Sequence, residues 1–503
     1  MRSTSPSHLR SRSAIFTPLF LLLCYCNVSS AQVVHDYVVT VDATLSRLSV
    51  EARFATSVRR VAARAADAGD VLMTAQDCDT GQQIRVRGRR LVLPVAGIEC
   101  LRYNVNLERA ARNERRNASL SPENIIVSPA VWLWRPLLDE STKIRVRFIL
   151  PDGVRVSVPW PQESDNSFLL GRSPESANAT AVFGNFEYHE LKVPAATLRV
   201  SLVKSSSGIN TDIILNWLKA AATDVTLAYG RFPNPSPQII VLPVGDRGRN
   251  GRSGSHGDSA VRFGRVVRDG GESVELFVNH RMPLEDFLAD WTATHEFSHL
   301  MLPYISRKHK WISEGFAQYY QNILLARSGA YEPVHAWQKL YEGLERGRKS
   351  RPELSPNDAA AGKLRDSLMK VYWSGAALAL LADVQLRERS SGEESLDLAL
   401  DKLQACCLPA DEVWTGPELM TKLDSMLSSP VFMPLYRRHA DTPGFPDVMG
   451  TLARLGVHIA DGKVELSSDA DLADIRSSMT KMDPQTARWR QQLAVNRSVS
   501  TSR

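Results

Sequence analysis

The segment His295-Glu-Phe-Ser-His299 contains the pattern His-Glu-x-x-His. Residues four apart lie on one face of a helix, so His295 and His299 can direct their imidazoles at one metal ion. Glu296 is offset too far to be a ligand, yet it is near enough to accept a proton from water at the metal. Pro303 indicates where this helix ends, since the residue before a proline disfavours the α conformation. The spacing therefore predicts a metal-dependent hydrolytic site with Glu296 as its general base.

A third ligand candidate, Glu314, lies fifteen residues after His299, in Trp311-Ile-Ser-Glu-Gly-Phe-Ala-Gln-Tyr-Tyr320. We expect this segment to open a second helix, with Glu314 in its first turn. A carboxylate from a second helix would complete a three-ligand site and leave a fourth position for water, as in catalytic zinc sites. The alternative interpretation of Glu314 is a charge at a helix N-terminus, which the helix dipole favours.

These two segments, together with Val371-Tyr-Trp-Ser-Gly-Ala-Ala-Leu-Ala-Leu-Leu-Ala-Asp383, resemble successive blocks of the glycyl aminopeptidase family of zinc metallopeptidases. That family is related to the aminopeptidase N and leukotriene A4 hydrolase type. The resemblance covers about residues 284–400. It implies one zinc ion per chain on His295, His299 and Glu314. It also implies a peptide or protein substrate, hydrolysed by water that Glu296 deprotonates.

The resemblance matches Tyr372 to the tyrosine of the family's Tyr-x-Lys-Gly block, where a phenol can donate a hydrogen bond to the oxyanion of the tetrahedral intermediate. Ser374 stands where that block has Lys, and a buried tyrosine at a helix start is the alternative interpretation of Tyr372. Relatives also present Gly-x-x-Glu on a strand before the metal helix to bind a free amino terminus. Gly254-Ser-His-Gly-Asp258 and Gly270-Gly-Glu272 match this element poorly, so terminal and internal cleavage both stay open.

Residues 36–203 consist mostly of short alternating or β-branched runs between turn residues, which predicts an all-β domain. After Ser205-Ser-Ser-Gly208 the pattern changes to an amphipathic helix over Ile209–Tyr229 and a buried strand over Gln238–Leu242, and helices dominate from Leu284. We expect an α+β multidomain fold, and the resemblance implies a thermolysin-like zinc peptidase domain at its centre. The expected divisions are a signal peptide (1–31), a β-rich N-terminal domain (32–205), a thermolysin-like catalytic domain with the metal helices (206–330), a helical domain that completes the active site (331–440) and a small C-terminal extension (441–503).

The first 31 residues have the layout of a secretory signal, with early arginines, an apolar run over Ala14–Cys26 and the small residues Ser29-Ser-Ala31. We expect cleavage after Ala31 and export to the periplasm or the extracellular space. No later stretch reaches about 18 consecutive apolar residues, so we expect no stable membrane span after cleavage. A lipid anchor at Cys24 is the alternative.

Four cysteines follow the expected cleavage site, and an oxidising compartment would let disulfides persist. We expect Cys78 to pair with Cys100, because the segment between them has the pattern of strand, turn and strand. The neighbours Cys406 and Cys407 could bridge each other, but we expect them to stay buried as small apolar residues.

The net charge of +6 comes from Lys and Arg spread along the chain, without a basic block or a nucleic-acid motif, so no nucleic-acid partner is expected. The leading hypothesis is an exported zinc metallopeptidase. Its rivals are a catalytically inactive binding protein with a peptidase-like fold and a zinc hydrolase that acts on a non-peptide bond. Glu296 favours an enzyme, because this residue would add nothing to metal affinity. The oligomeric state stays open.

Overall fold

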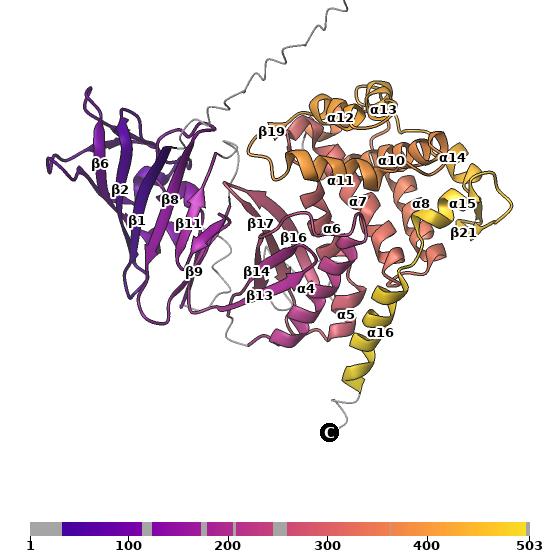
Figure 1. Ribbon diagram of the computed structural model, residues 1–503, viewed down its shortest axis with the longest axis horizontal. Helices are drawn as coiled ribbons and strands as arrows, with labels where there is room; N and C mark the ends of the chain where they lie inside the picture. The colour runs from indigo at the N-terminus through magenta and orange to yellow at the C-terminus, as the bar shows by residue number, and fades with distance from the viewer. Residues whose placement is uncertain are drawn as a thin grey trace, which may run out of the picture.

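The computed structural model describes residues 33–112, 123–172, 179–204, 208–244, 259–362 and 364–498. A β-rich part formed by residues 33–184 lies at the left of Figure 1, a smaller sheet covered by helices lies in the middle, and a helical part lies at the right. The expected α+β class, with a β-rich front and a helical rear, is confirmed. The expected signal peptide lies outside the described residues.

The N-terminal part is built on a seven-stranded sheet with the order β10-β11-β8-β1-β2-β6-β3, beside a three-stranded sheet β7-β12-β9. Alternate residues of β1, including Tyr37, Val39 and Val41, are buried in a core that belongs to this part alone. Its elements are β1 (Val33–Val41), β2 (Arg47–Val58), α1 (Ala68–Val71), β3 (Leu72–Asp77), β4 (Arg85–Arg87), β5 (Arg90–Val92), β6 (Ile98–Asn106), α2 (Leu107–Arg112), β7 (Asn124–Val127), α3 (Pro129–Trp132), β8 (Thr142–Ile149), β9 (Arg155–Ser157), β10 (Gln162–Ser164), β11 (Ser167–Leu170) and β12 (Ala181–Gly184).

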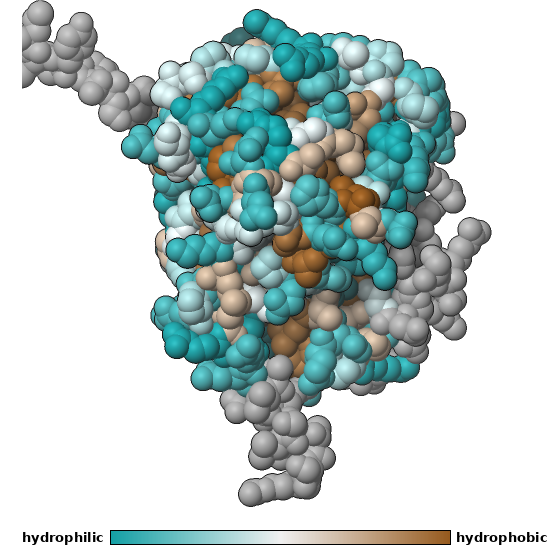
Figure 2. All heavy atoms as spheres, turned by 90° about the vertical axis from the view of Figure 1, so that its right-hand side faces the viewer, coloured by the Kyte–Doolittle hydropathy of each residue, from teal (hydrophilic) through white to brown (hydrophobic). Residues whose placement is uncertain are grey.

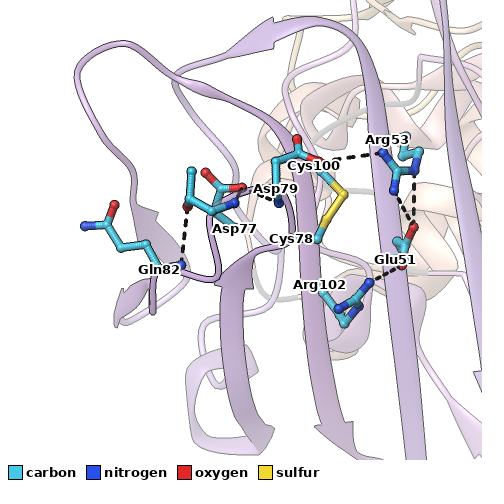
Figure 3. The surroundings of a disulfide bond; sticks show 9 residues. Glu51, Arg53, Asp77, Cys78, Asp79, Gln82, Cys100 and Arg102 are labelled. Atoms are coloured by element: carbon cyan, nitrogen blue, oxygen red, sulfur yellow. Dashed lines mark hydrogen bonds and ion pairs between the residues drawn. A yellow bond between two sulfur atoms is a disulfide. The ribbon is translucent and has the colours of Figure 1, made fainter.

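A disulfide joins Cys78, which follows β3, to Cys100 on β6, as the sequence predicted (Figure 3). The two residues are neighbours because β3 and β6 are paired antiparallel, and the Cys78 amide donates a hydrogen bond to the Cys100 carbonyl. The bridge therefore links two strands that already lie side by side, at the edge of the seven-stranded sheet.

The middle sheet has five strands in the order β13-β14-β15-β17-β16, with β16 at one edge. Its first two strands precede residue 205, so the structure places the start of this unit earlier than the expected division. The side chains of Leu198, Val200 and Leu202 explain the difference, because they are buried in the core of the middle and helical parts. The elements are β13 (Glu187–Val193), β14 (Ala196–Leu202), α4 (Thr211–Thr226), β15 (Gln238–Pro243), β16 (Val261–Arg268) and β17 (Glu272–Val278).

The helical part shares one continuous core with the middle sheet, extending from Leu198 to Met479. The expected divisions at 330 and 440 therefore do not separate independent cores. The elements are α5 (Leu284–Ala289), α6 (Thr292–Ser298), η2 (His299–Met301), β18 (Tyr304–Ile305), η3 (Arg307–His309), α7 (Lys310–Arg327), α8 (Pro333–Lys349), α9 (Pro356–Ala361), α10 (Leu364–Arg389), α11 (Leu396–Cys407), β19 (Val413–Trp414), α12 (Gly416–Ser425), α13 (Phe432–His439), α14 (Met449–Arg454), β20 (Val457–Ala460), β21 (Lys463–Leu466), α15 (Ala473–Met479) and α16 (Pro484–Ser498).

The expectation of buried thiols at Cys406 and Cys407 is wrong. Both residues lie at the end of α11, where Cys406 is exposed and Cys407 is half-buried, and their sulfur atoms are bonded to each other. Cys407 only borders the core at the end of this helix and Cys406 faces solvent, so neither residue is enclosed as the prediction required.

The face formed by the C-terminal side of the molecule is mostly hydrophilic, and apolar residues occur on it as separate patches (Figure 2). Within the described part of the chain, no helix combines the length and apolar character needed to cross a bilayer.

Candidate active site

The two histidines of the first motif lie at the end of one short helix. His295 is on α6, and His299 begins the 3₁₀ turn η2, which continues from α6 without a break. Leu302, the residue before Pro303, is extended, so the helical segment ends where the proline requires. Both histidine side chains are buried, at 2% and 8% exposure, which places them inside the molecule and not on its surface.

Glu314 reaches the two histidines from α7. The Glu314 Oε2 atom lies 3.6 Å from Nε2 of His295 and 3.3 Å from Nε2 of His299. One donor atom from each of the three residues falls within 4.8 Å of the others, and all three residues are buried. The helix starts earlier than expected, at Lys310, so Glu314 is its fifth residue and does not lie in the first turn. From this second-turn position the carboxylate reaches both histidines of the α6 segment.

Two polar side chains of α7 contact the Nδ1 atoms of the histidine rings, the ring nitrogens that do not face Glu314. His295 Nδ1 lies 2.9 Å from Gln321 Oε1, and His299 Nδ1 lies 3.0 Å from Ser313 Oγ. The amide oxygen of Gln321 can only accept, so Nδ1 of His295 carries a proton and Nε2 is the nitrogen that faces the cluster. Sequence reasoning missed both residues. The signal was available for Gln321, because it lies seven residues after Glu314 and therefore on the same face of the helix.

The donor set fits zinc. Two imidazole nitrogens and one carboxylate oxygen are the ligands of many catalytic zinc sites. Burial lowers the pKa of His299 to about 4, which keeps this ring neutral and able to coordinate a cation. Burial alone would raise the pKa of Glu314, but its contacts with His299 and His295 and the charge of Lys310 hold it well below its usual range. The site therefore offers a neutral His299 and an ionised Glu314.

Lys310 is a further charged neighbour that the sequence did not single out. Its Nζ atom lies 2.7 Å from Oε1 of Glu314, one helical turn along α7. Oε1 thus faces the lysine while Oε2 faces the histidines. The ion pair with Lys310 fixes the Glu314 carboxylate so that one of its oxygens points at the two histidines.

Glu296 lies beside the cluster and is 8% exposed. Burial raises its pKa to about 7, because removing water from the carboxyl group disfavours the charged form, and the nearby charge of His295 only partly opposes this. A carboxyl group with a pKa near neutrality is suited to accept and return a proton.

Gly264 on β16 leaves the space that Glu296 occupies. An added Cβ at Gly264 would lie 2.5 Å from Cγ of Glu296 and 2.9 Å from its Oε1. Because residue 264 has no side chain, the backbone of the edge strand β16 can lie closer to the Glu296 carboxyl group than it could with any other residue at this position. Sequence reasoning missed this glycine, because the contact joins residues far apart in the chain.

Tyr372 comes to the cluster from α10. Its ring lies 5.9 Å from the ring of His295 and is nearly parallel to it, with an angle of 11° between the planes. Burial and then the charges of Glu314 and Glu296 raise the pKa of the phenol, so it stays protonated and can donate a hydrogen bond. Tyr372 lies inside α10, not at a helix start, and Ser374 is fully buried.

Two glycines allow α10 to bring Tyr372 this close. A Cβ at Gly315 would lie 2.1 Å from the backbone of Gly375, and a Cβ at Gly375 would lie 2.0 Å from the carbonyl oxygen of Trp311. The backbones of α7 and α10 are thus in direct contact. Glu314 and Tyr372 lie within three residues of these glycines. The close helix contact therefore brings their side chains together.

Arg268, the last residue of β16, fixes the end of the segment that carries His295 and His299. Its Nη2 atom donates to the carbonyl oxygens of His299 at 2.9 Å and Leu302 at 3.0 Å, and its Nε atom donates to Glu272. Glu272 also accepts from Asn234 and is 5% exposed. The Glu272 carboxylate is therefore already bound by Arg268 and Asn234. Glu272 belongs to one of the two segments that match the amino-terminus-binding element poorly. The other, Gly254–Asp258, lies outside the described residues.

Comparison with known proteins finds a family model that matches part of the chain and solved structures with a similar fold. Residues 305–362 match the family model described as M61 glycyl aminopeptidase, a segment that includes Glu314 but begins after His299. No curated protein matches the chain. The fold matches that of an aminopeptidase N family protein from Idiomarina loihiensis, with a TM-score of 0.61 and 13% identity over 85% of this chain and 79% of that one. An M1 zinc metallopeptidase from Deinococcus radiodurans gives a TM-score of 0.49 and 14% identity over 82% and 94%.

Proposed function

We propose that this relative of the glycyl aminopeptidases is an exported zinc metallopeptidase that binds one zinc ion per chain and hydrolyses peptide bonds with Glu296 as its general base. One observation carries the proposal: His295, His299 and Glu314 direct three ligand atoms at one point, and Glu296 lies directly beside them. The matched family model and the aminopeptidase fold support the same class of enzyme.

Each residue has a defined task in this mechanism. His295, His299 and Glu314 hold the cation, and a bound zinc ion would acidify a water molecule and polarise the scissile carbonyl. Glu296 orients that water, accepts its proton and delivers the proton to the leaving amine. Tyr372 donates its phenolic hydrogen to the carbonyl oxygen as negative charge develops there. The burial of His295, His299, Glu314 and Glu296 excludes bulk water from these groups, which strengthens their electrostatic interactions.

The edge strand β16 supports a peptide as the substrate. Among the described residues β16 pairs with β17 along one side only, and Gly264 at its centre faces Glu296. An extended peptide can add to a sheet edge through backbone hydrogen bonds. Such a peptide would pass directly beside Glu296, and this arrangement brings a backbone carbonyl to the catalytic residues without the need for a particular side chain.

Export rests on the sequence of residues 1–31 and agrees with the cysteine chemistry. The disulfide between Cys78 and Cys100 persists most readily in an oxidising compartment. We therefore assign the mature protein to the periplasm or the extracellular space. The test is the mass of the protein recovered from that compartment. Cleavage after Ala31 predicts a mass that corresponds to residues 32–503.

The test of the activity compares Glu296→Gln with Glu285→Gln, a change of an exposed carboxylate on α5. Both variants and the unchanged protein receive a peptide library, and the products are identified by mass spectrometry. The proposal requires that Glu296→Gln keeps zinc and loses cleavage while Glu285→Gln cleaves normally. The positions of the new termini decide between terminal and internal cleavage.

Each rival has a clear outcome in the same experiment. A catalytically inactive binding protein would cleave no peptide in any form. A zinc hydrolase of a non-peptide bond would hold zinc, leave every peptide intact and hydrolyse an ester or epoxide in a manner that depends on Glu296.

A further inference from the structure

A cavity of about 1530 Å³ lies outside the metal cluster, between the N-terminal part and the strand β19. Its lining comes from the segments after β2, around β5, before β8 and at β19. Nothing in the proposed mechanism uses this cavity. Its composition is uneven, because arginine is the most frequent residue type in the lining.

Four of the arginines, Arg59, Arg60, Arg89 and Arg90, are exposed and come from two segments that lie side by side. Backbone hydrogen bonds join these segments: the Leu91 amide donates to Val61, and the Ala63 amide donates to Arg89. Among the described residues, none of the four forms an ion pair within 4.0 Å. We call these four residues the arginine wall.

The rest of the lining is largely neutralised by its own contacts. Arg64 and Arg135 pair with the buried Asp269, at 2.9 Å and 3.7 Å. Arg172 pairs with Glu412 and with Glu140. Asp139 and Asp411 also line the cavity, but its lining still has seven arginines against four carboxylates. The arginine wall therefore carries positive charge that the other described lining residues do not neutralise.

The cavity lies where a substrate bound along β16 would leave the catalytic residues. Asp269, which Arg64 binds from the cavity side, directly follows Arg268, and Arg268 holds the His299 carbonyl. On the other side, Val413 of the lining pairs with Tyr304, only five residues after His299. Both connections place the cavity at the end of β16 and next to the end of the segment that carries His295 and His299.

We propose that the arginine wall binds a carboxylate-rich segment of the substrate, several residues away from the scissile bond. Guanidinium groups pair well with carboxylates, and a group of like charges in a cleft attracts the opposite charge. The enzyme then prefers peptides with an acidic stretch on the side that passes the end of β16. This inference rests on the proposed peptidase function for the identity of the ligand as a substrate.

Binding is tested without cleavage. Fluorescein-labelled hexaglutamate and hexaglutamine are titrated with full-length Glu296→Gln protein at low ionic strength, and anisotropy is measured. The proposal requires that hexaglutamate binds at least roughly tenfold more tightly, and that Arg60→Gln with Arg90→Gln removes most of this difference. The matched control is Arg47→Gln with Arg147→Gln, two exposed arginines on the seven-stranded sheet that do not line the cavity. Equal binding of the two peptides, or equal losses in the two double variants, would overturn the proposal.

Cleavage gives a second readout with the native Glu296. The ratio of kcat/KM for an acidic peptide to that for its Gln-substituted twin should fall by roughly tenfold in the Arg60→Gln, Arg90→Gln protein and stay constant in the control. Cleavage without any acidic preference would overturn the cavity proposal and leave the peptidase intact. Binding of hexaglutamate that depends on the arginine wall, with no cleavage of any peptide, would instead refute the peptidase and keep the wall as a site for acidic peptides. Displacement of hexaglutamate by inorganic phosphate, beyond that by chloride at equal ionic strength, would make it a phosphate site and overturn the proposal.

Discussion

The amide oxygen of Gln321 lies 2.9 Å from Nδ1 of His295, on the side of the ring opposite the nitrogen that faces Glu314. Ser313 holds Nδ1 of His299 in the same manner. One helix, α7, thus supplies a proposed metal ligand and the two side chains that orient the other ligands. The geometry of the cluster depends on this helix as a unit.

We expect Gln321→Leu to weaken zinc binding, because the imidazole of His295 loses the contact that fixes its orientation and tautomer. Loss of such a partner costs about tenfold to a hundredfold in metal affinity. Competition with a zinc chelator measures the change. Ser298→Ala is the matched control, since its hydroxyl donates a hydrogen bond within α6, to the Thr294 carbonyl. Equal affinities in the two variants would contradict the role of Gln321.

Gly264→Ala should damage catalysis while zinc stays bound. The new Cβ would lie 2.5 Å from Cγ of Glu296 and push the carboxyl group away from the cluster. A shift of about 1 Å in a catalytic group lowers the rate by about a hundredfold. Gly171→Ala is the control, because a Cβ there meets no atom within 4 Å. Steady-state kinetics and zinc content are measured on both variants, and a fully active Gly264→Ala protein would be incompatible with the observed contact.

Tyr372→Phe should lower kcat by about a hundredfold to a thousandfold and change KM little, because the hydroxyl acts only when charge develops on the carbonyl oxygen. Zinc content should not change, since the phenol is not among the three proposed ligands. Tyr341→Phe, on the half-buried side of α8, is the control. If the two variants had the same kcat, Tyr372 would be a packing residue only.

Glu296 also makes the stability of the zinc-free protein depend on pH. Burial raises its pKa from 4.5 to about 7, so the native state favours the uncharged form. This contribution to stability is present below pH 4.5 and is lost as the pH rises through about 7. Glu296→Gln has no such loss. The unfolding free energy of this variant minus that of the unchanged protein should therefore rise by up to about 3 kcal/mol between pH 4.5 and pH 8. Urea unfolding at both pH values measures this. A difference that does not vary with pH would contradict the buried position of Glu296.

Local spacing was sufficient to predict the residues that share one motif. His295, Glu296 and His299 lie on one short helical segment, so their mutual arrangement follows from the chain itself. Glu314 required the resemblance as well, since fifteen residues of intervening chain can fold in many ways. The structure brings all four together, and their roles stay predictions.

Long-range packing determined what the sequence did not predict. Gly264 meets Glu296, and Arg268 holds the carbonyl of His299, only because β16 lies against α6 in the folded chain. The strands β13 and β14 lie next to the all-β part in sequence, but β14 pairs with β15, so their pattern could not show to which sheet they belong. The arginine wall likewise unites two segments of the chain that only pairing brings together.

The most direct test of the central claim is a zinc titration of the metal-free protein, with peptide cleavage as the readout. The proposed site predicts that activity rises linearly and stops rising at one zinc ion per chain, and that Glu314→Gln binds zinc far more weakly and is not restored. Cleavage that persists after zinc removal, or a Glu314→Gln protein that is restored with the same single equivalent, would contradict a catalytic zinc ion on His295, His299 and Glu314.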